Sequence, residues 1–262
     1  MNYSRYVALG DSFTEGVGDP DPLLPNGVRG WADRFAEGLD RAQGGGLAYA
    51  NLAIRGRKLR QIVAEQVERA VELEPDLVSI YAGANDIMRP AVDLDALMGK
   101  YDKAIAELSA TGAKVLMFTA FDPSHAKTYA AVRGRFALYC EYVREIAEKH
   151  DATLIDYWRL REFRDTRMWD IDRMHMSAAG HQLMAINVLE KLGVKHDLEP
   201  LDVVYPPQLD GREQRAANLH GAKIYLGPWV KRRVTGRSSG DGLAPRWGDL
   251  KPVSDLATYT AQ

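Results

Sequence analysis

Short apolar segments alternate with longer amphipathic ones from residue 6 to about residue 193. The apolar segments are rich in β-branched or aromatic residues and are followed by turn-forming residues, which is typical of buried strands. They cover residues 6–10, 47–54, 77–83, 114–121 and 153–158. The amphipathic segments carry apolar residues three or four positions apart, which predicts helices with one buried face. They cover residues 31–41, 59–73, 94–110, 132–149 and 178–192.

This alternation predicts an α/β fold. A strand, a helix and another strand joined by short connections form a crossover unit, and repeated units build a mostly parallel sheet with helices on both faces. Functional sites in such sheets lie at the carboxyl ends of the strands. We therefore expect functional residues directly after Gly10, Ile54, Gly83, Phe121 and Trp158.

The pattern stops after about Gly193, and the rest of the chain has six prolines and no long periodic segment. We expect two parts, a domain over residues 1–193 and an irregular C-terminal extension over residues 194–262 that packs on it or wraps it. Six basic and two acidic residues lie between positions 228 and 252, a local charge of +4. This basic stretch is interpreted either as a solvated surface or as a contact for an anionic ligand, a partner or a second copy of the chain, which would form a homo-oligomer.

Charge and composition exclude several classes of protein. The 34 basic and 36 acidic residues leave a net charge of -2, so no global field draws the molecule to nucleic acid or an anionic membrane. The single cysteine, Cys140, cannot form an internal disulfide and does not indicate a cysteine-based zinc site. No apolar segment approaches the roughly 18 residues of a membrane span, and the first residues lack the apolar region of a signal peptide. We expect a cytoplasmic protein without stable membrane insertion.

Three of the strand ends carry residues suited to chemistry. Ser12, in the sequence GDSFTEG, follows the first strand and is either a nucleophile or a helix cap. Gly56 follows the second strand and allows a backbone N–H to approach a ligand. Asn85 follows the third and offers a side-chain amide, while Asp86 can hold the loop; taken alone, this Asn-Asp pair is equally typical of a helix cap.

A carboxylate and an imidazole occur together before the last predicted helix. Asp172 and His175 lie three residues apart in the loop that ends at Ser177, a good N-cap. A carboxylate beside an imidazole fixes its tautomer and stabilises its protonated form. Asp170 is the rival acid, and His125, which follows the fourth strand, is a second candidate base.

Together these residues supply a nucleophile, a base, an orienting acid and donors for an oxyanion, the set that acyl transfer requires. Ser12 in GDS, Gly56 in NLAIRG, Asn85 in GAND and His175 in DRMH also resemble, in order, the four sequence blocks of the SGNH or GDSL-type hydrolases, which are esterases and lipases. The resemblance covers about residues 5 to 193. It implies a three-layer flavodoxin-like fold with a parallel five-stranded sheet.

The resemblance also implies roles for individual residues. Ser12 matches the nucleophile, His175 the general base and Asp172 the orienting acid, while the oxyanion donors are the backbone N–H groups of Ser12 and Gly56 and the side chain of Asn85. We therefore expect a cofactor-independent serine hydrolase that cleaves small-molecule carboxylic esters through an acyl-enzyme. Short acyl chains are favoured because no long apolar groove is evident. An acyltransferase or a sugar or metabolite deacetylase with the same site is the alternative, followed by a non-catalytic binding module.

Other motifs do not fit their required context. Residues 236–240 satisfy G-x-S-x-G around Ser238, but that motif needs a following helix and a later histidine. Residues 241–245 begin no helix and the last histidine is His220, so we do not expect Ser238 to be the nucleophile. Neither a glycine-rich nucleotide motif nor a histidine and carboxylate cluster with metal-ligand spacing occurs, so no nucleotide or metal is expected.

Overall fold

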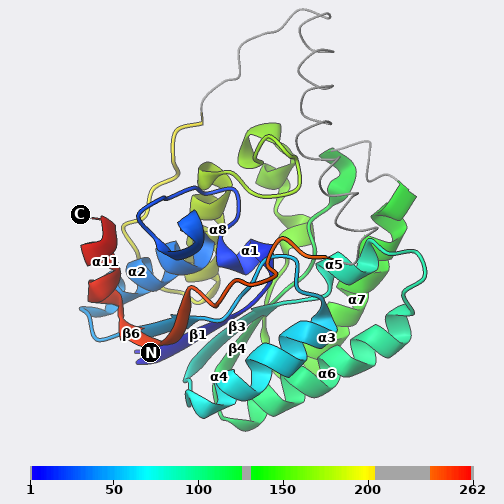
Figure 1. The fold of residues 1–262 in the computed structure, drawn as a ribbon, viewed down its shortest axis with the longest axis horizontal. Helices are drawn as coiled ribbons and strands as arrows, with labels where there is room; N and C mark the ends of the chain where they lie inside the picture. The colour runs from blue at the N-terminus through cyan, green and yellow to red at the C-terminus, as the bar shows by residue number, and fades with distance from the viewer. Residues whose placement is uncertain (1, 126–130, 204–236, 261–262) are drawn as a thin grey trace, which may run out of the picture.

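A six-stranded sheet forms the centre of the molecule in the computed structural model, which describes residues 2–125, 131–203 and 237–260 (Figure 1). The strands are β1 (Arg5–Gly10), β2 (Ala48–Asn51), β3 (Leu77–Tyr81), β4 (Lys114–Phe118), β5 (Thr153–Ile155) and β6 (Trp247–Pro252). Their order in the sheet is β5-β4-β3-β1-β2-β6. The first five are parallel, and β6 runs antiparallel to β2. The predicted mostly parallel α/β fold is confirmed, with one strand more than expected.

The strongly apolar strands lie in the middle of this sheet. β1 pairs with both β2 and β3, so that Tyr6 lies between Tyr49 and Leu77. Every residue of β3 is buried, because helices cover both faces of a parallel sheet and leave no solvated side. This is why the strand segments appear in the sequence as continuous apolar runs.

The five predicted amphipathic segments form the main helices. They are α2 (Trp31–Gln43), the continuous series α3 (Leu59–Ile62), π-helical η2 (Val63–Val67) and α4 (Glu68–Glu72), then α6 (Leu94–Ala110), α7 (Arg133–Lys149) and α8 (Ala178–Lys191). Two short helices follow strand ends, α1 (Ser12–Glu15) and α5 (Ala84–Ile87). Short 3-10 helices occupy the loops: η1 (Pro25–Gly27), η3 (Pro123–His125), η5 (Tyr157–Arg159), η6 (Arg161–Arg164) and η7 (Thr166–Met168).

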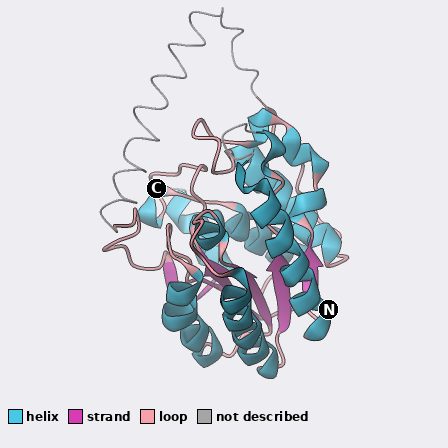
Figure 2. Ribbon diagram, turned by 90° about the vertical axis from the view of Figure 1, so that its right-hand side faces the viewer, coloured by secondary structure: helices cyan, strands magenta, loops and turns pink. Residues whose placement is uncertain are grey.

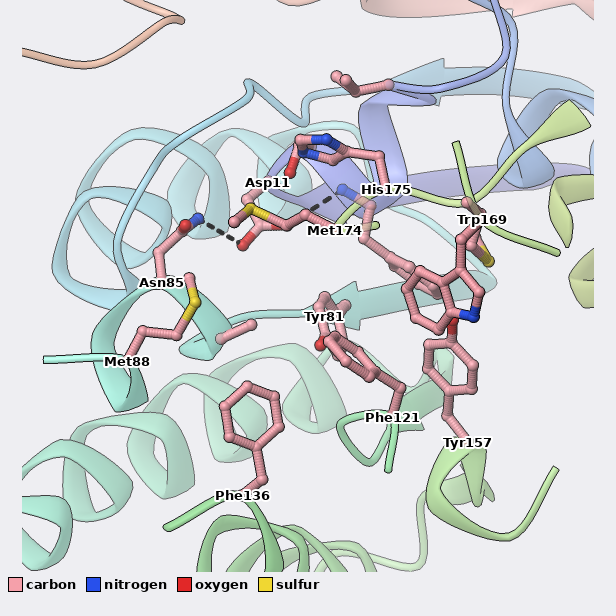
Figure 3. A pocket seen from close by; sticks show the side chains of 15 residues that line it. Asp11, Tyr81, Asn85, Met88, Phe121, Phe136, Tyr157, Trp169, Met174 and His175 are labelled. Atoms are coloured by element: carbon pink, nitrogen blue, oxygen red, sulfur yellow. Dashed lines mark hydrogen bonds between the residues drawn. The ribbon is translucent and has the colours of Figure 1, made fainter. Parts of the chain in front are cut away.

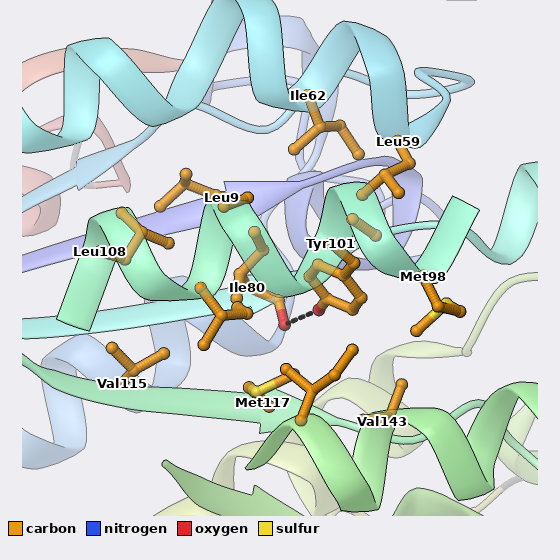
Figure 4. Close-up of a cluster of buried hydrophobic side chains, with 14 of the residues drawn as sticks. Leu9, Leu59, Ile62, Ile80, Met98, Tyr101, Leu108, Val115, Met117 and Val143 are labelled. Carbon is orange, nitrogen blue, oxygen red and sulfur yellow. Dashed lines mark hydrogen bonds between the residues drawn. The ribbon is translucent and has the colours of Figure 1, made fainter. Parts of the chain in front are cut away.

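The helices form two layers on the sheet, seen from the side in Figure 2. One apolar cluster joins the sheet to the α3–α4 series, α6 and α7, with Leu9, Ile80 and Tyr101 near its centre (Figure 4). Tyr101 also donates a hydrogen bond to the carbonyl of Ile80 (3.3 Å). The second cluster joins the opposite face to α2, α8 and a C-terminal helix, α11 (Val253–Thr260). The molecule is therefore a three-layer α/β sandwich.

The sixth strand comes from the C-terminal extension, where no regular element was predicted. β6 pairs with β2 at the edge of the sheet, and α11 lies beside α2 (Figure 1). The sequence of β6, WGDLKP, combines glycine, aspartate and proline and has no alternating pattern. Such residues are tolerated in an edge strand, and pairing with β2 rather than local propensity defines the element.

Arg246, directly before β6, links the extension to the core. Its guanidinium is fully buried and forms an ion pair with Asp33 of α2 at 2.6 Å. It also donates hydrogen bonds to the carbonyl oxygens of Glu15 (3.0 Å) and Arg29 (2.6 Å). A buried charge needs such a complete set of partners, because an unpaired one carries a large desolvation penalty. These contacts hold the start of β6 beside the loop that follows α1.

Candidate active site

Ser12 lies in the turn between β1 and α1, at the carboxyl end of the sheet. Gly10 has a φ of +150°, and a side chain there would lie 2.7 Å from the carbonyl oxygen of Tyr81, so the close passage of β1 past β3 requires glycine. The Asp11 carboxylate caps α1 by accepting the N–H of Phe13 (3.2 Å). The Phe13 ring packs against Tyr81 with a centroid separation of 4.5 Å. Ser12 is thus held between a rigid strand end and an aromatic anchor.

Gln66 fixes the same strand end from the π-helical segment η2. Its side-chain amide donates to the carbonyl of Gly10 (3.0 Å) and accepts the Gly10 N–H (2.8 Å). The side chain is buried, and π-helical turns are frequent at functional sites. The sequence analysis missed this residue. The available signal was a polar residue on the apolar face of the helix, four positions from both Ile62 and Ala70.

Asp172 and His175 form a hydrogen-bonded pair. Asp172 Oδ2 lies 2.6 Å from His175 Nδ1, while Oδ1 accepts the backbone N–H groups of Met174 (2.8 Å) and His175 (2.9 Å). Burial alone would raise the pKa of Asp172, but the hydrogen bond and charge of His175 and the backbone donors outweigh it and hold the pKa below its usual range. Asp172 is therefore a carboxylate at neutral pH. This geometry suits an acid that orients an imidazole.

The rival acid, Asp170, has a different place in the same loop. Its backbone N–H donates to the carbonyl of His175 (2.8 Å), next to an antiparallel bridge between Trp169 and Met176. Within the described residues its carboxylate makes no hydrogen bond to the imidazole of His175. The loop is thus a narrow hairpin that directs Asp172, rather than Asp170, at the ring.

Two further histidines, His181 and His150, have structural environments. His181 is fully buried, accepts the N–H of Trp31 (3.0 Å) and donates to the carbonyl of Val17 (3.1 Å). Burial lowers the pKa of His181 to about 4, so it is neutral and locked. His150 lies 2.7 Å from Asp102. His125 ends η3, but its side chain lies outside the described part of the structure, as does the whole of His220.

Ser12 and His175 line the same cavity, which we call the aromatic pocket (Figure 3). It has a volume of about 50 Å³. Within the described residues no hydrogen bond joins the Ser12 hydroxyl to His175, and contacts between a nucleophile and its base are often loose before substrate binds. Figure 3 shows the aromatic rings on one side of the pocket and the polar groups Asp11, Asn85 and His175 on the other. The rings are those of Phe13, Tyr81, Phe121, Phe136, Tyr157 and Trp169.

Asn85 also lines the aromatic pocket, but both of its amide protons are engaged. Nδ2 donates to Asp11 Oδ2 (2.9 Å) and to the carbonyl of Arg57 (3.1 Å). Burial is the main cause that raises the pKa of Asp11 to about 7, so near neutral pH this acceptor exists in both protonation states. An oxyanion that binds Asn85 has to replace one of these two acceptors.

The two backbone donors named in the sequence analysis are free. Among the described residues neither the N–H of Ser12 nor that of Gly56 has a hydrogen-bond partner. Gly56 has a φ of +75°, and a side chain there would collide with Ser238 Oγ. Position 56 therefore requires glycine both for its backbone conformation and for the close approach of the C-terminal extension.

Ser12 also lines a second and larger cavity, which we call the basic pocket. Its volume is about 280 Å³. It shares Ser12, Val17, Asn85, Met88, Met174 and His175 with the aromatic pocket. Its own lining comprises Arg55, Gly56, Lys58, Arg60, Gln61, Arg89, Arg237, Ser238, Ser239 and Asp241.

Part of the basic pocket comes from the C-terminal extension, within the basic stretch that was interpreted as a solvated surface or as a contact for an anionic ligand, a partner or a second copy. The hydroxyl of Ser238 donates to the carbonyl of Arg55 (3.2 Å) and accepts the N–H of Gly240 (3.1 Å). These contacts hold residues 237–241 against the loop that carries Gly56. Ser238, which we did not expect to be the nucleophile, thus lies in the wall of the site. Its hydroxyl is hydrogen-bonded to backbone groups.

The family model of the GDSL-like lipase/acylhydrolase family matches residues 8–183 of the chain. This protein therefore belongs to the GDSL-like lipase/acylhydrolase family, as the four sequence blocks indicated. At the level of its family it is an enzyme, a carboxylic ester hydrolase. No curated protein sequence matches the chain.

Solved structures of two esterases share the fold. Axe2, an acetylxylan esterase from Geobacillus stearothermophilus, has 22% sequence identity and a TM-score of 0.60 over 73% of this chain and 95% of its own. The psychrotrophic esterase EstA from Pseudoalteromonas sp. has 16% identity and a TM-score of 0.57 over 72% of this chain and 97% of its own. Within the described residues no helix is long and apolar enough to cross a membrane.

Proposed function

We propose that this protein hydrolyses small carboxylic esters with a short acyl group, through an acyl-enzyme formed on Ser12. The observation that carries the proposal is the hydrogen-bonded pair of Asp172 and His175, 2.6 Å apart, in the wall of the pocket that Ser12 also lines. This combination supplies an oriented base next to a hydroxyl at a strand end, which nucleophilic catalysis requires.

In the proposed reaction His175 Nε2 takes the proton of the Ser12 hydroxyl while Ser12 Oγ attacks the ester carbonyl. Asp172 holds the opposite nitrogen, Nδ1, in its protonated form and stabilises the imidazolium. The tetrahedral intermediate expels the alcohol, which receives the proton from His175. Water then attacks the acyl-enzyme by the same route, releases the carboxylic acid and restores Ser12.

The negative charge of the tetrahedral intermediate is assigned to three donors. The N–H groups of Ser12 and Gly56 are available without rearrangement, since neither has a partner among the described residues. Asn85 becomes the third donor when one of its amide N–H groups breaks its hydrogen bond to Asp11 or to the Arg57 carbonyl. Preorganised donors of this kind stabilise the transition state, because no solvent has to reorganise around the new charge.

The aromatic pocket is assigned to the acyl group. Its wall is made of rings, and its volume of about 50 Å³ is small beside the 280 Å³ of the basic pocket. A largely apolar cavity of this volume favours acetyl and other short acyl chains. The acetylxylan esterase with the same fold acts, by its name, on an acetyl ester.

An acyltransferase or a deacetylase of a sugar or metabolite remains the second function for this site. The basic pocket offers a polar space next to Ser12 in which an acceptor alcohol could take the place of water. Product analysis with and without added alcohols separates the two. A non-catalytic binding module is the third alternative. It would be favoured if the folded wild-type protein cleaved no ester.

We also propose that residues 1–193 are the hydrolase domain and that residues 194–262 are an extension packed on it. The pairing of β6 with β2 and the buried ion pair of Arg246 with Asp33 support this division. A cytoplasmic location and an oligomer formed through the extension stay predictions from the sequence.

The test compares two serine variants that line the same site. Ser12→Ala should lower kcat/KM for p-nitrophenyl acetate at least about 10³-fold, because the nucleophile is lost. The matched control Ser238→Ala should retain far more activity than Ser12→Ala, since its hydroxyl contacts backbone groups and takes no part in the proposed reaction. Full activity in Ser12→Ala would overturn the proposal. A series from acetate to octanoate, measured on the wild type, should show the highest kcat/KM at the shortest chains.

A further inference from the structure

The charge distribution of the basic pocket points to a property of the alcohol part of the substrate. An ester bound with its carbonyl carbon at Ser12 places its acyl group on one side and its alcohol on the other. If the aromatic pocket takes the acyl group, the alcohol lies in the basic pocket. The inference below therefore rests on the proposed function.

Five cationic side chains line the basic pocket, against one carboxylate. Two members of this set are already neutralised. Arg55 forms an ion pair with Glu15 (2.8 Å), and the carboxylate, Asp241, lies 3.5 Å from Arg57. Four cations remain, and none of them forms an ion pair among the described residues: Lys58, Arg60, Arg89 and Arg237.

Arg89 has the environment of a binding residue rather than of a solvated surface charge. Its side chain is half-buried, and among the described residues its Nε is buried without a hydrogen-bond partner. Because this Nε is shielded from solvent, a ligand in the pocket would meet the other N–H groups of the Arg89 guanidinium. Lys58 is also half-buried, while Arg60 and Arg237 are exposed at the rim.

One buried acidic group interacts with two of these cations but does not line the pocket. Asp86 interacts electrostatically with Lys58 and Arg89, but its carboxylate accepts the N–H of Leu59 (2.9 Å) and is buried beneath the loop. Burial raises the pKa of Asp86, and its carboxylate offsets part of the positive charge of Lys58 and Arg89. The pocket thus keeps a surplus of positive charge in a protein whose net charge is -2.

We propose that the alcohol part of the ester carries a phosphate group, which lies in the basic pocket among Lys58, Arg60, Arg89 and Arg237. Phosphate fits better than a single carboxylate because it presents three acceptor oxygens and close to two charges to four cations. Guanidinium groups match its geometry through pairs of parallel N–H donors. The small cavity favours a small molecule over a polymer, which would need a continuous basic surface.

A matched substrate series tests this proposal. 2-Acetoxyethyl phosphate, 2-hydroxyethyl acetate and acetylcholine are acetyl esters of similar size whose alcohols carry a negative, no and a positive charge. We expect kcat/KM to fall in that order, with the phosphate ester about tenfold or more above the neutral one at low ionic strength. The preference should shrink as NaCl is raised, because salt screens the attraction. 4-Acetoxybutanoate distinguishes phosphate from a general preference for anions.

Charge-neutralising variants connect this selectivity to the pocket. In Arg89→Gln and Lys58→Gln the ratio of kcat/KM for the phosphate ester to that for the neutral ester should fall about tenfold. The control Lys100→Gln removes the same charge from the exposed surface of α6 and should leave the ratio unchanged. Inorganic phosphate should inhibit the wild type competitively, and more weakly in Arg89→Gln.

The outcomes separate this inference from the proposed function. Equal kcat/KM for the three acetyl esters, or a preference for acetylcholine, would overturn the phosphate proposal and leave the esterase proposal standing. A carboxylate ester cleaved as well as the phosphate ester would overturn the choice of phosphate. Failure to cleave any acetyl ester, including p-nitrophenyl acetate, would overturn the proposed function itself.

Discussion

The two pockets that meet at Ser12 differ in composition and in origin. The aromatic pocket is small and walled by rings, and all of its lining residues come from positions 11–176. The basic pocket is larger and cationic, and it combines that core with residues 237–241 of the extension. The aromatic pocket thus lies wholly within the residues 8–183 that match the family model, whereas the basic pocket also takes residues from outside them.

Replacement of Asp172, the proposed orienting acid, should have the largest effect, because its partner His175 lines both pockets. Asp172→Asn should lower kcat about 10³- to 10⁴-fold, since an amide in place of the carboxylate favours the wrong tautomer of His175. The loss should be equal for charged and neutral esters, measured as initial rates at pH 7 to 8. A loss smaller than tenfold would show that Asp172 does not orient the base. Asp170→Asn is the matched control and should retain most of the activity.

Weaker attachment of the C-terminal extension should change the basic pocket more than the aromatic pocket. Arg246→Met leaves the buried Asp33 without its ion-pair partner, and should lower the free energy of unfolding by about 3 to 5 kcal/mol in urea denaturation. The double variant with Asp33→Asn should recover part of this loss, because it removes the isolated charge. The folded fraction of Arg246→Met should lose more of its preference for the phosphate ester than of its activity on p-nitrophenyl acetate, because the extension lines only the basic pocket. A change below about 1 kcal/mol would contradict a structural role for the ion pair.

Asn85 lies where the two pockets join. Asn85→Ala should lower kcat about 10²- to 10³-fold, equivalent to about 2.7 to 4 kcal/mol of transition-state stabilisation, with a small change in KM. Asn187→Ala, which removes an asparagine on α8, is the control. If Asn85 only held the loop through Asp11 and the Arg57 carbonyl, the variant would lose thermal stability and keep most of its kcat.

The smallest expected effect concerns the acyl pocket alone. Phe121→Ala removes one half-buried ring and should raise the ratio of kcat/KM for butyrate over acetate esters about tenfold, since two further methylenes gain roughly 0.8 kcal/mol each on burial. The choice between the phosphate and neutral alcohols should not change. An unaltered chain-length profile would show that this cavity does not hold the acyl group.

The sequence predicted those site residues whose positions follow from the order of strands and loops along the chain. Buried strands are continuous apolar runs, and Ser12, Asn85 and the loop of His175 follow them at fixed places, so the sheet brings these residues to one edge. The pairing of Asp172 with His175 could be expected because only three positions separate the two residues.

The remaining features depend on contacts between distant parts of the chain. β6 has no strand pattern of its own and exists through its pairing with β2. Gln66 is polar on an apolar helix face, and only the folded chain brings its amide to Gly10. Ser238 reaches Gly56 across more than 180 positions, which no local pattern announces. The partners that occupy both protons of Asn85 likewise follow from the path of the loop at Arg57.

The identity of the nucleophile is the central claim, and covalent labelling tests it most directly. Wild-type protein and the variants Ser12→Ala and Ser238→Ala are treated with a fluorophosphonate, and the site of modification is mapped by mass spectrometry of peptides. We predict one adduct per chain on Ser12, present also in Ser238→Ala and absent from Ser12→Ala. An adduct on Ser238, or no adduct on folded and active wild-type protein, would contradict the account.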